Sequence, residues 1–157
     1  MNNCEIERKF LVRGDFKAAA VSSTRIRQAY INQAGERTVR IRIRDDKAYL
    51  TIKGPSTDGV SRFEWETAIP VEDAEQLMEM RVTAVIDKRR FLVPFGSHTW
   101  EVDEFYGENE GLTMAEVELS APDEAFERPD WLGAEVTGDY HYYNSYISRH
   151  PYKEWAE

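Results

Sequence analysis

The sequence predicts a mainly β protein of the α+β class, in which eight antiparallel strands close into a barrel and a few helices lie outside. Two observations lead to this expectation. Apolar and polar residues alternate along most of the chain, which is the two-residue period of a strand. The polar face of nearly every such segment also carries two or three charged side chains. About eight strands are enough to close a barrel, so these faces can line a charged tunnel.

The strands follow one another with turn signals between them. Asp45-Asp46 predicts a hairpin turn, Gly54 to Gly59 a loop, and Pro94-Phe95-Gly96 a second hairpin. The predicted strands are residues 4–12, 26–32, 37–45, 47–53, 61–69, 84–93, 98–106 and 113–120.

Short helices are expected near residues 15–22, 71–81 and 138–149. Acidic residues in the first turn support the second of these. We expect all of them to cover the apolar outer faces of the strands. The segment 122–133 stays unassigned because Pro122 and Pro129 interrupt it. Without a linker or repeat, residues 1–157 are expected to form a single domain.

Composition narrows the classes of partner. The formal net charge of −9 disfavours a nucleic-acid partner. No apolar run reaches the roughly 20 residues of a membrane helix, and charges from Glu5 onward argue against a signal peptide. The single cysteine, Cys4, fits a reducing compartment. We therefore expect a cytoplasmic protein with a small-molecule partner, while the sequence leaves open whether it forms a homodimer.

Charged side chains recur at every second position, beginning with Glu5, Glu7 and Lys9. For any single strand, a solvated outer face is the more common explanation of such a pattern. The repeated groups of Arg and Glu on successive strands favour a shared lumen instead. Two carboxylates beside an ammonium are costly in an apolar core and suit a place where a metal ion meets an anion.

The chemistry of these side chains points to a metal-bound polyphosphate. Guanidinium groups match phosphate oxygens bidentately. Carboxylate clusters without His or Cys favour a hard cation such as Mg²⁺ or Mn²⁺. The candidate phosphate-binding residues are Lys9, Arg40, Arg42, Arg44, Lys53, Arg62, Lys88 and Arg90. The candidate metal ligands are Glu5, Glu7, Glu64, Glu66, Asp103, Glu116 and Glu118.

An ordered series of short motifs resembles a known family over nearly the whole chain. It comprises Glu5-x-Glu7-x-Lys9, Val39-Arg40-Ile41-Arg42, Thr51-Ile52-Lys53-Gly54, Arg62-x-Glu64-x-Glu66, Lys88-Arg89-Arg90, Glu101-Val102-Asp103, Glu116-Val117-Glu118 and Val136-Thr137-Gly138-Asp139 with Asn144. The first motif resembles the ExExK signature of the CYTH superfamily, the triphosphate tunnel metalloenzymes. This resemblance implies an eight-stranded tunnel that acts on triphosphates with a divalent metal.

The resemblance also implies roles by position. Glu5, Glu7 and Glu116 would hold one metal ion. Either Glu64 or Glu66, together with Asp103 and Glu118, would hold a second ion or orient water. Lys9, Arg40, Arg42, Lys53, Lys88 and Arg90 would grip phosphates. His141 departs from the Arg or Lys that the family often has there, which puts a phosphate contact from that segment in doubt or makes it pH-dependent.

Tyr30 is the candidate general base. It shares a strand face with Gln28 and Asn32 if the alternation is regular. A free tyrosine has a pKa of about 10, so a nearby cation such as Lys9 would be needed to favour its ionised form. The resemblance to bacterial tripolyphosphatases of this family implies that Lys9 and Tyr30 form such a pair. The alternative is an ordinary half-exposed strand tyrosine.

These observations predict a metal-dependent hydrolase of inorganic tripolyphosphate or a related triphosphate. Three alternatives stay open: a class IV adenylate cyclase, a thiamine-triphosphatase and a non-catalytic polyphosphate-binding module. The cyclase is disfavoured because no adenine pocket is evident in the sequence.

Overall fold

The computed structural model describes residues 4–56 and 58–155. Its strands are β1 (Cys4–Val12), β2 (Ser22–Ala34), β3 (Arg37–Arg44), β4 (Lys47–Ser56), β5 (Ser61–Ile69), β6 (Ile86–Phe95), β7 (His98–Phe105), β8 (Thr113–Glu118) and β9 (Leu132–Glu135). Its α-helices are α1 (Val71–Met78) and α2 (Asn144–Ile147). Four 3₁₀ turns complete it: η1 (Lys17–Ala19), η2 (Gly107–Asn109), η3 (Tyr140–Tyr142) and η4 (Tyr152–Glu154).

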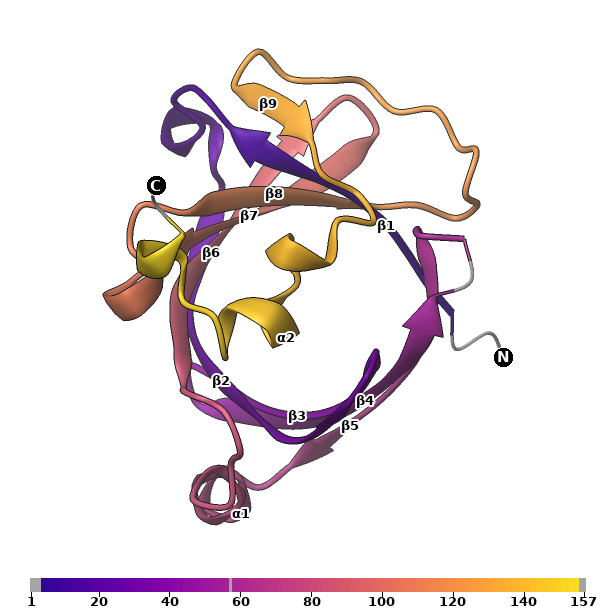
Figure 1. The fold of residues 1–157 in the computed structure, drawn as a ribbon. Coiled ribbons are helices and arrows are strands. Elements are labelled where there is room, and N and C mark those ends of the chain that lie inside the picture. The colour runs from indigo at the N-terminus through magenta and orange to yellow at the C-terminus, as the bar shows by residue number, and fades with distance from the viewer. Residues whose placement is uncertain (1–3, 57, 156–157) are drawn as a thin grey trace.

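Eight of the strands close into an antiparallel barrel, which Figure 1 shows in a view along its interior. The order is β5-β4-β3-β2-β6-β7-β8-β1, and β1 completes the ring by pairing with β5. The closing register runs from Cys4 opposite Phe63 to Ile6 opposite Ser61. The predicted eight-stranded barrel is therefore confirmed. A further short strand, β9, pairs with β1 next to the barrel; it begins at the end of the segment 122–133, which the sequence left unassigned.

Several boundaries differ from the sequence prediction. The expected helix near 15–22 is only the turn η1, and β2 already begins at Ser22. Strand β4 continues through Gly54-Pro55, which was expected to begin a loop. The register of β4 against β5 shifts between Lys53 and Ser56, and proline is tolerated at such irregular positions because no ladder hydrogen bond is required of it. The predicted helix over 71–81 ends at Met78.

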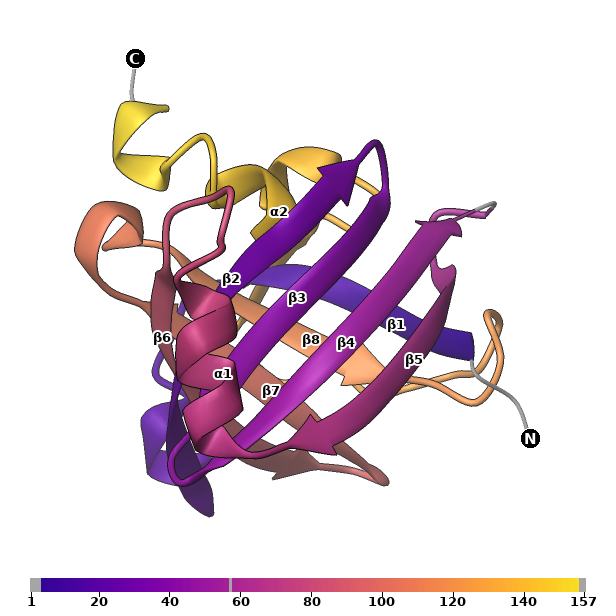
Figure 2. The same ribbon diagram turned by 90° about the horizontal axis from the view of Figure 1, so that it is seen from below.

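Two apolar clusters cover the outside of the barrel. Helix α1 packs Ala74 and Met78 against Ile41, Ile43 and Ala48 on β3 and β4, and Figure 2 shows it lying along the outer surface of these strands. A second cluster covers the opposite wall, with Phe10, Trp100, Val102, Val117 and Trp131 among its members. The apolar alternate residues of the strands thus face outward, as the pattern predicted.

The C-terminal segment departs from the expected arrangement. We expected residues 138–149 to cover an outer face, but α2 lies across one end of the barrel (Figures 1 and 2). Its Ile147 is buried with Ile86, Phe105, Leu112 and Met114. Ile86, Phe105 and Met114 occupy the alternate positions of their strands that face the barrel interior. This cluster therefore closes the lumen at that end. No helix in residues 4–56 and 58–155 is long and apolar enough to cross a membrane.

Candidate functional site

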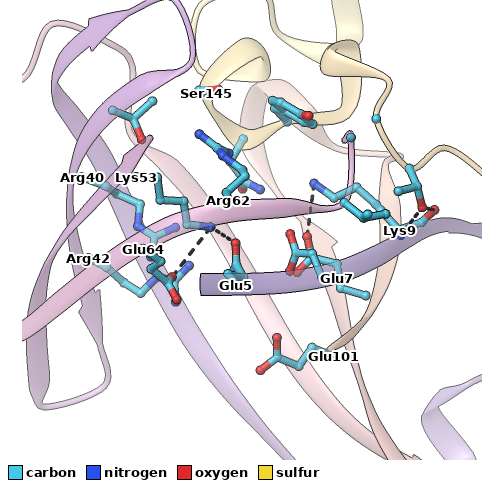
Figure 3. Close-up of a pocket in the computed structure, with 18 of the residues that line it drawn as sticks. Glu5, Glu7, Lys9, Arg40, Arg42, Lys53, Arg62, Glu64, Glu101 and Ser145 are labelled. Carbon is cyan, nitrogen blue, oxygen red and sulfur yellow. Dashed lines mark hydrogen bonds and ion pairs between the residues drawn. The ribbon is translucent and has the colours of Figure 1, made fainter. Parts of the chain in front are cut away.

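A polar cavity occupies the interior of the barrel, and most of the predicted site residues line it. Figure 3 shows charged side chains from β1, β3, β4, β5 and β7 converging on this space. The lining consists of Glu5, Glu7, Lys9, Tyr30, Thr38, Arg40, Arg42, Lys53, Gly59, Val60, Arg62, Glu64, Arg90, Glu101, Glu116, Thr137, Gly138, Tyr143, Asn144 and Ser145. The charged faces of the strands therefore point into the barrel and line its lumen. They are not solvated outer faces, which was the alternative explanation of the charge pattern.

Strand β1 carries two carboxylates in different electrostatic surroundings. Glu5 accepts a hydrogen bond of 2.8 Å from the Lys53 ammonium. Burial opposes ionisation there, but Lys53 lowers the pKa of Glu5 below its ordinary value. Glu7 forms no ion pair within the described residues. Burial, together with the charges of Glu116 and Glu5, raises the pKa of Glu7 to about 8. Glu7 is thus a carboxylate that a bound cation would favour in its ionised form.

Glu116 faces β1 from β8 and is held by cations. Lys9 Nζ lies 3.2 Å from one of its oxygens, and Arg90 Nη2 lies 3.8 Å from the other. Burial acts to raise the pKa of Glu116, but Lys9 and Arg90 outweigh it and lower the pKa to about 2. Lys9 also donates to the Tyr142 carbonyl at 3.2 Å. The pKa of Lys9 is raised despite its burial, chiefly by Glu116 and then Glu7, so its ammonium stays charged.

Three arginines approach the cavity from β3 and β5. Arg40 contacts the Thr51 hydroxyl at 3.2 Å and lies 3.7 Å from Glu66. Arg62 is fixed by backbone carbonyls, with its Nε donating to Gly54 and its Nη2 donating to Glu36. Arg42 donates from Nε to a buried glutamine, and the pKa of Arg42 is lowered to about 9 by burial and by its cationic neighbours Arg40 and Arg90.

Asp103 joins two of the predicted phosphate-binding cations. Arg90 donates two parallel hydrogen bonds to it, at 2.8 and 2.9 Å, and Lys88 Nζ lies 2.8 Å from one of its oxygens. Burial alone would raise the pKa of Asp103, but Arg90 and Lys88 hold it far below its ordinary value. Burial outweighs this ion pair for Lys88 and lowers the pKa of its ammonium to about 7. Both carboxylate oxygens of Asp103 are therefore already engaged by protein cations.

Five predicted site residues lie outside the cavity lining. Lys88 and Asp103 are buried behind it. Glu66 accepts a hydrogen bond of 2.7 Å from Thr51. Arg44 donates to the Tyr49 hydroxyl at 3.2 Å, and Glu118 is exposed opposite Glu7. Between Glu64 and Glu66, which the sequence left undecided, the structure places Glu64 on the cavity, 3.8 Å from Lys53.

Tyr30 is buried and lines the cavity, opposite Arg40 on β3. The expected regular alternation fails just beyond it. A register shift between Tyr30 and Asn32 places Asn32 opposite Val39, and Asn32 is exposed. A bulge adds one residue to one strand and so changes which face the following residues occupy. Gln28 and Tyr30 therefore share the lumen, whereas Asn32 does not.

Sequence reasoning missed several residues of this cavity. Glu101 shares the charged strand face of Asp103 and belongs to the Glu101-Val102-Asp103 motif, but it was assigned no role. Tyr143 and Ser145 gave no signal in the sequence, because they reach the cavity only when α2 folds over the end of the barrel, and Asn144 stood in the last of the family-like motifs without an assigned role. His141 lies outside the lining, where its Nδ1 is 2.7 Å from Asp139 Oδ1.

The donor set of this cavity fits a hard divalent cation. Glu5, Glu7 and Glu116 offer carboxylate oxygens, and Glu7 is a buried carboxylate whose pKa is raised by its acidic neighbours. Within the described residues, no three His, Cys, Asp or Glu side chains stand ready around a single ion position. Glu5 is turned to Lys53 and Glu116 to Lys9, so coordination would require these ion pairs to loosen.

Comparison with known proteins identifies close relatives. Residues 3–149 match the model of the CYTH domain. The chain is 47% identical over 154 residues to an inorganic triphosphatase of Acetivibrio thermocellus, covering 98% of each protein. It is 34% identical over 149 residues to an inorganic triphosphatase of Nitrosomonas europaea, covering 92% of this chain and 96% of that one.

The fold is also found among solved structures. The crystal structure of the inorganic triphosphatase NE1496 superimposes with a TM-score of 0.67 at 29% identity, covering 92% of this chain and 97% of that one. The PH1012 protein of Pyrococcus horikoshii has a TM-score of 0.59 at 22% identity, with 76% of this chain and 81% of that one covered. This second likeness concerns the fold alone.

Proposed function

The chain belongs to the CYTH domain family, and we propose that it is a divalent-metal-dependent triphosphatase whose main substrate is inorganic tripolyphosphate. One observation carries the proposal: the barrel interior brings cationic side chains and carboxylates to one cavity. The relatives named inorganic triphosphatases, at 47% and 34% identity, support the same reaction. The absence of cysteines other than Cys4 fits a cytoplasmic location.

The cations of the cavity would bind and orient the substrate. Arg40, Arg42 and Lys53 reach it from β3 and β4, and Lys9 and Arg90 from β1 and β6. A linear triphosphate threaded between these two groups would have its oxygens contacted along its length. Binding would be strong because guanidinium and ammonium donors act in a partly desolvated space.

The carboxylates would hold the metal ion, which we propose to be Mg²⁺ or Mn²⁺. Glu5, Glu7 and Glu116 are the proposed ligands, with Glu64 near them. When bound, such an ion supplies charge neutralisation for phosphate oxygens. Glu66, Glu118 and Asp103 are the weaker candidates because they lie outside the cavity lining or are engaged by cations. We propose that Asp103 instead aligns Arg90 and Lys88.

Tyr30 is the proposed general base for hydrolysis. Its phenolate would accept a proton from a water molecule while the water oxygen forms a bond to the terminal phosphorus. The bond from that phosphorus to the bridging oxygen breaks, and its electron pair leaves with pyrophosphate. Lys9, which lines the same cavity and whose charge is secured by Glu116, is the cation proposed to assist it.

A second candidate substrate carries an organic ring. A cavity of about 360 Å³ adjoins the tunnel and shares Tyr143 and Ser145 with it. Tyr140, Tyr146 and His150 also line this second cavity. Aromatic walls of this kind accept flat rings. The sequence showed no evident adenine pocket, but this second cavity offers a place for the ring of an organic triphosphate.

One experiment separates these functions. The protein is incubated with tripolyphosphate, ATP or thiamine triphosphate, each with Mg²⁺, Mn²⁺ or EDTA, and the products are identified. We expect orthophosphate and pyrophosphate from tripolyphosphate, faster than any product from ATP, and no turnover in EDTA. Cyclic AMP as the main product from ATP would support a cyclase. Tight binding of all three without turnover would support a binding module.

A further inference from the structure

Two carboxamides, one of them fully buried, link the end of the barrel to an arginine of the cavity. Gln28 on β2 is fully buried, and Asn144 is the first residue of α2. Gln28 Nε2 donates to Asn144 Oδ1 at 3.2 Å, and Gln28 Oε1 accepts from Arg42 Nε at 2.9 Å. Lys88 Nζ donates to the same Asn144 oxygen at 3.0 Å. The contacts form a continuous path from Lys88 through Asn144 and Gln28 to Arg42.

The orientation of both amides is fixed by the cations at the two ends of this path. Lys88 in its ammonium form has no acceptor, so the Asn144 atom that faces it is the oxygen. The Gln28 atom that faces this oxygen must then be its NH₂ group. Arg42 is also a pure donor, and the Gln28 atom that remains to face it is the oxygen. Reversal of either amide would place two donors against each other.

Arg42 differs from most cations of the cavity in its partners. Lys9, Lys53 and Arg90 are each paired with a carboxylate. Within residues 4–56 and 58–155, Arg42 has no carboxylate partner, and its Nη groups form no hydrogen bond or ion pair. Because Gln28 fixes Nε, these two Nη groups are the donors left to face the cavity that Arg42 lines.

We propose that Gln28 and Asn144 are positioning residues, which hold Arg42 in the orientation that presents its Nη groups to a phosphate of the substrate. This inference rests on the proposed function and deepens it. It gives α2 a part in substrate binding besides closure of the barrel end. Gln28 acts only through Arg42, because it is fully buried and does not line the cavity, whereas Asn144 also lines the cavity.

A purely structural role predicts a different outcome, and the chain offers a matched control. Gln33, also on β2, donates to the Ser145 carbonyl at 2.9 Å and accepts from Arg149. It anchors the same helix to the same strand but has no hydrogen bond to a cation that lines the charged cavity inside the barrel. If Gln28 merely anchors α2, then Gln28→Met and Gln33→Met should affect substrate binding alike.

The test is a double-mutant cycle on substrate binding. The dissociation constant of inorganic tripolyphosphate is measured by calorimetry in EDTA for wild type, Gln28→Met, Arg42→Ala and the double variant. We expect Gln28→Met to weaken binding about 10-fold, a usual effect of losing a positioning partner. The double variant should bind within about twofold of Arg42→Ala, because the losses of binding free energy are not additive when one residue acts only through the other. Gln33→Met should change binding less than about twofold.

Asn144 provides an independent route if Gln28→Met does not fold. Asn144→Ala removes the acceptor and should weaken binding about 10-fold in the presence of Arg42, but less than about twofold in the Arg42→Ala background. Additive losses in the cycle, or equal losses in Gln28→Met and Gln33→Met, would overturn the inference. A wild type that binds tripolyphosphate but never hydrolyses it would overturn the proposed function and leave this binding test intact.

Discussion

Lys53 and Glu5 meet inside the barrel, with the ammonium nitrogen 2.8 Å from a carboxylate oxygen and both side chains largely buried. They come from β4 and β1, which are separated by β5 in the ring. Figure 3 shows Lys53 reaching toward both Glu5 and Glu64. A candidate phosphate-binding residue therefore also neutralises a candidate metal ligand, which ties the stability of the barrel interior to its binding chemistry.

Lys53→Met should destabilise the protein and weaken substrate binding. Removing one partner of a buried ion pair leaves an uncompensated charge, which costs about 3 kcal/mol in the free energy of unfolding. The pKa of Glu5 is lowered in the wild type, so the contribution of the pair is present above the ordinary carboxyl pKa and is lost as pH falls. Urea unfolding in EDTA should show a large deficit at pH 8 that shrinks toward pH 4. Adding Glu5→Gln should recover part of it, and a deficit that does not depend on pH would contradict this account.

Glu7→Gln should stabilise the protein in EDTA while removing most of its activity. The pKa of Glu7 is raised from 4.5 to about 8, first by burial and then by Glu116 and Glu5. The folded chain thus keeps a proton that the unfolded chain releases, and wild-type stability falls as pH rises from 4.5 to 8. The stability gained in the variant should grow over this range and level off above it. Glu5→Gln is the comparison: it loses the Lys53 pair and should not share the gain. Near-wild-type turnover of Glu7→Gln with Mg²⁺ would remove Glu7 from the metal site.

Tyr30→Phe should act on the chemical step. The substitution deletes only a hydroxyl from a buried side chain that lines the cavity. Loss of general-base assistance typically costs about 10²- to 10⁴-fold in kcat, with KM nearly constant. Lys9→Met should raise KM as well, because Lys9 is also a proposed phosphate ligand. The measurement is kcat and KM for tripolyphosphate from pH 7 to 10. Full activity of Tyr30→Phe across the alkaline range would transfer the role to a water oriented by Glu64.

Tyr146→Ala should discriminate between inorganic and organic substrates. Tyr146 lines the aromatic cavity but not the charged one. If an organic ring occupies the aromatic cavity, the variant should lower kcat/KM for ATP about 10-fold, since one aromatic contact contributes about 1–3 kcal/mol to stacking. The value for tripolyphosphate should stay within about twofold. Equal losses for both substrates would show that the variant disturbs α2 rather than a ring-binding surface.

Much of the fold and of the candidate site could be predicted from the sequence because a strand has a fixed two-residue period. Arg40 and Arg42 must share one face of β3, and Ile41 and Ile43 the other, wherever the strand lies. The predicted strands and the closed barrel are confirmed on this basis. The same period grouped Glu5 with Glu7, and both line the cavity.

The period fails where the backbone departs from regularity or where position along the barrel matters. The bulge after Tyr30 moved Asn32 out of the lumen, and alternation cannot reveal an inserted residue. Arg44 has the same parity as Arg42 but lies beyond the cavity, beside Tyr49. Parity assigns a face, whereas the stagger of neighbouring strands decides which level of the tunnel a residue occupies.

The sequence by itself determined the strands, their two faces and the chemical character of the lumen, because these follow from local geometry and side-chain type. Only the tertiary structure decided which charges meet. Lys88 and Asn144 are 56 residues apart and share a hydrogen bond of 3.0 Å. Contacts of this kind form when α2 closes the barrel end and its Ile147 is buried against Phe105. No local pattern encodes that placement, because it results from the packing of segments that are distant in the chain.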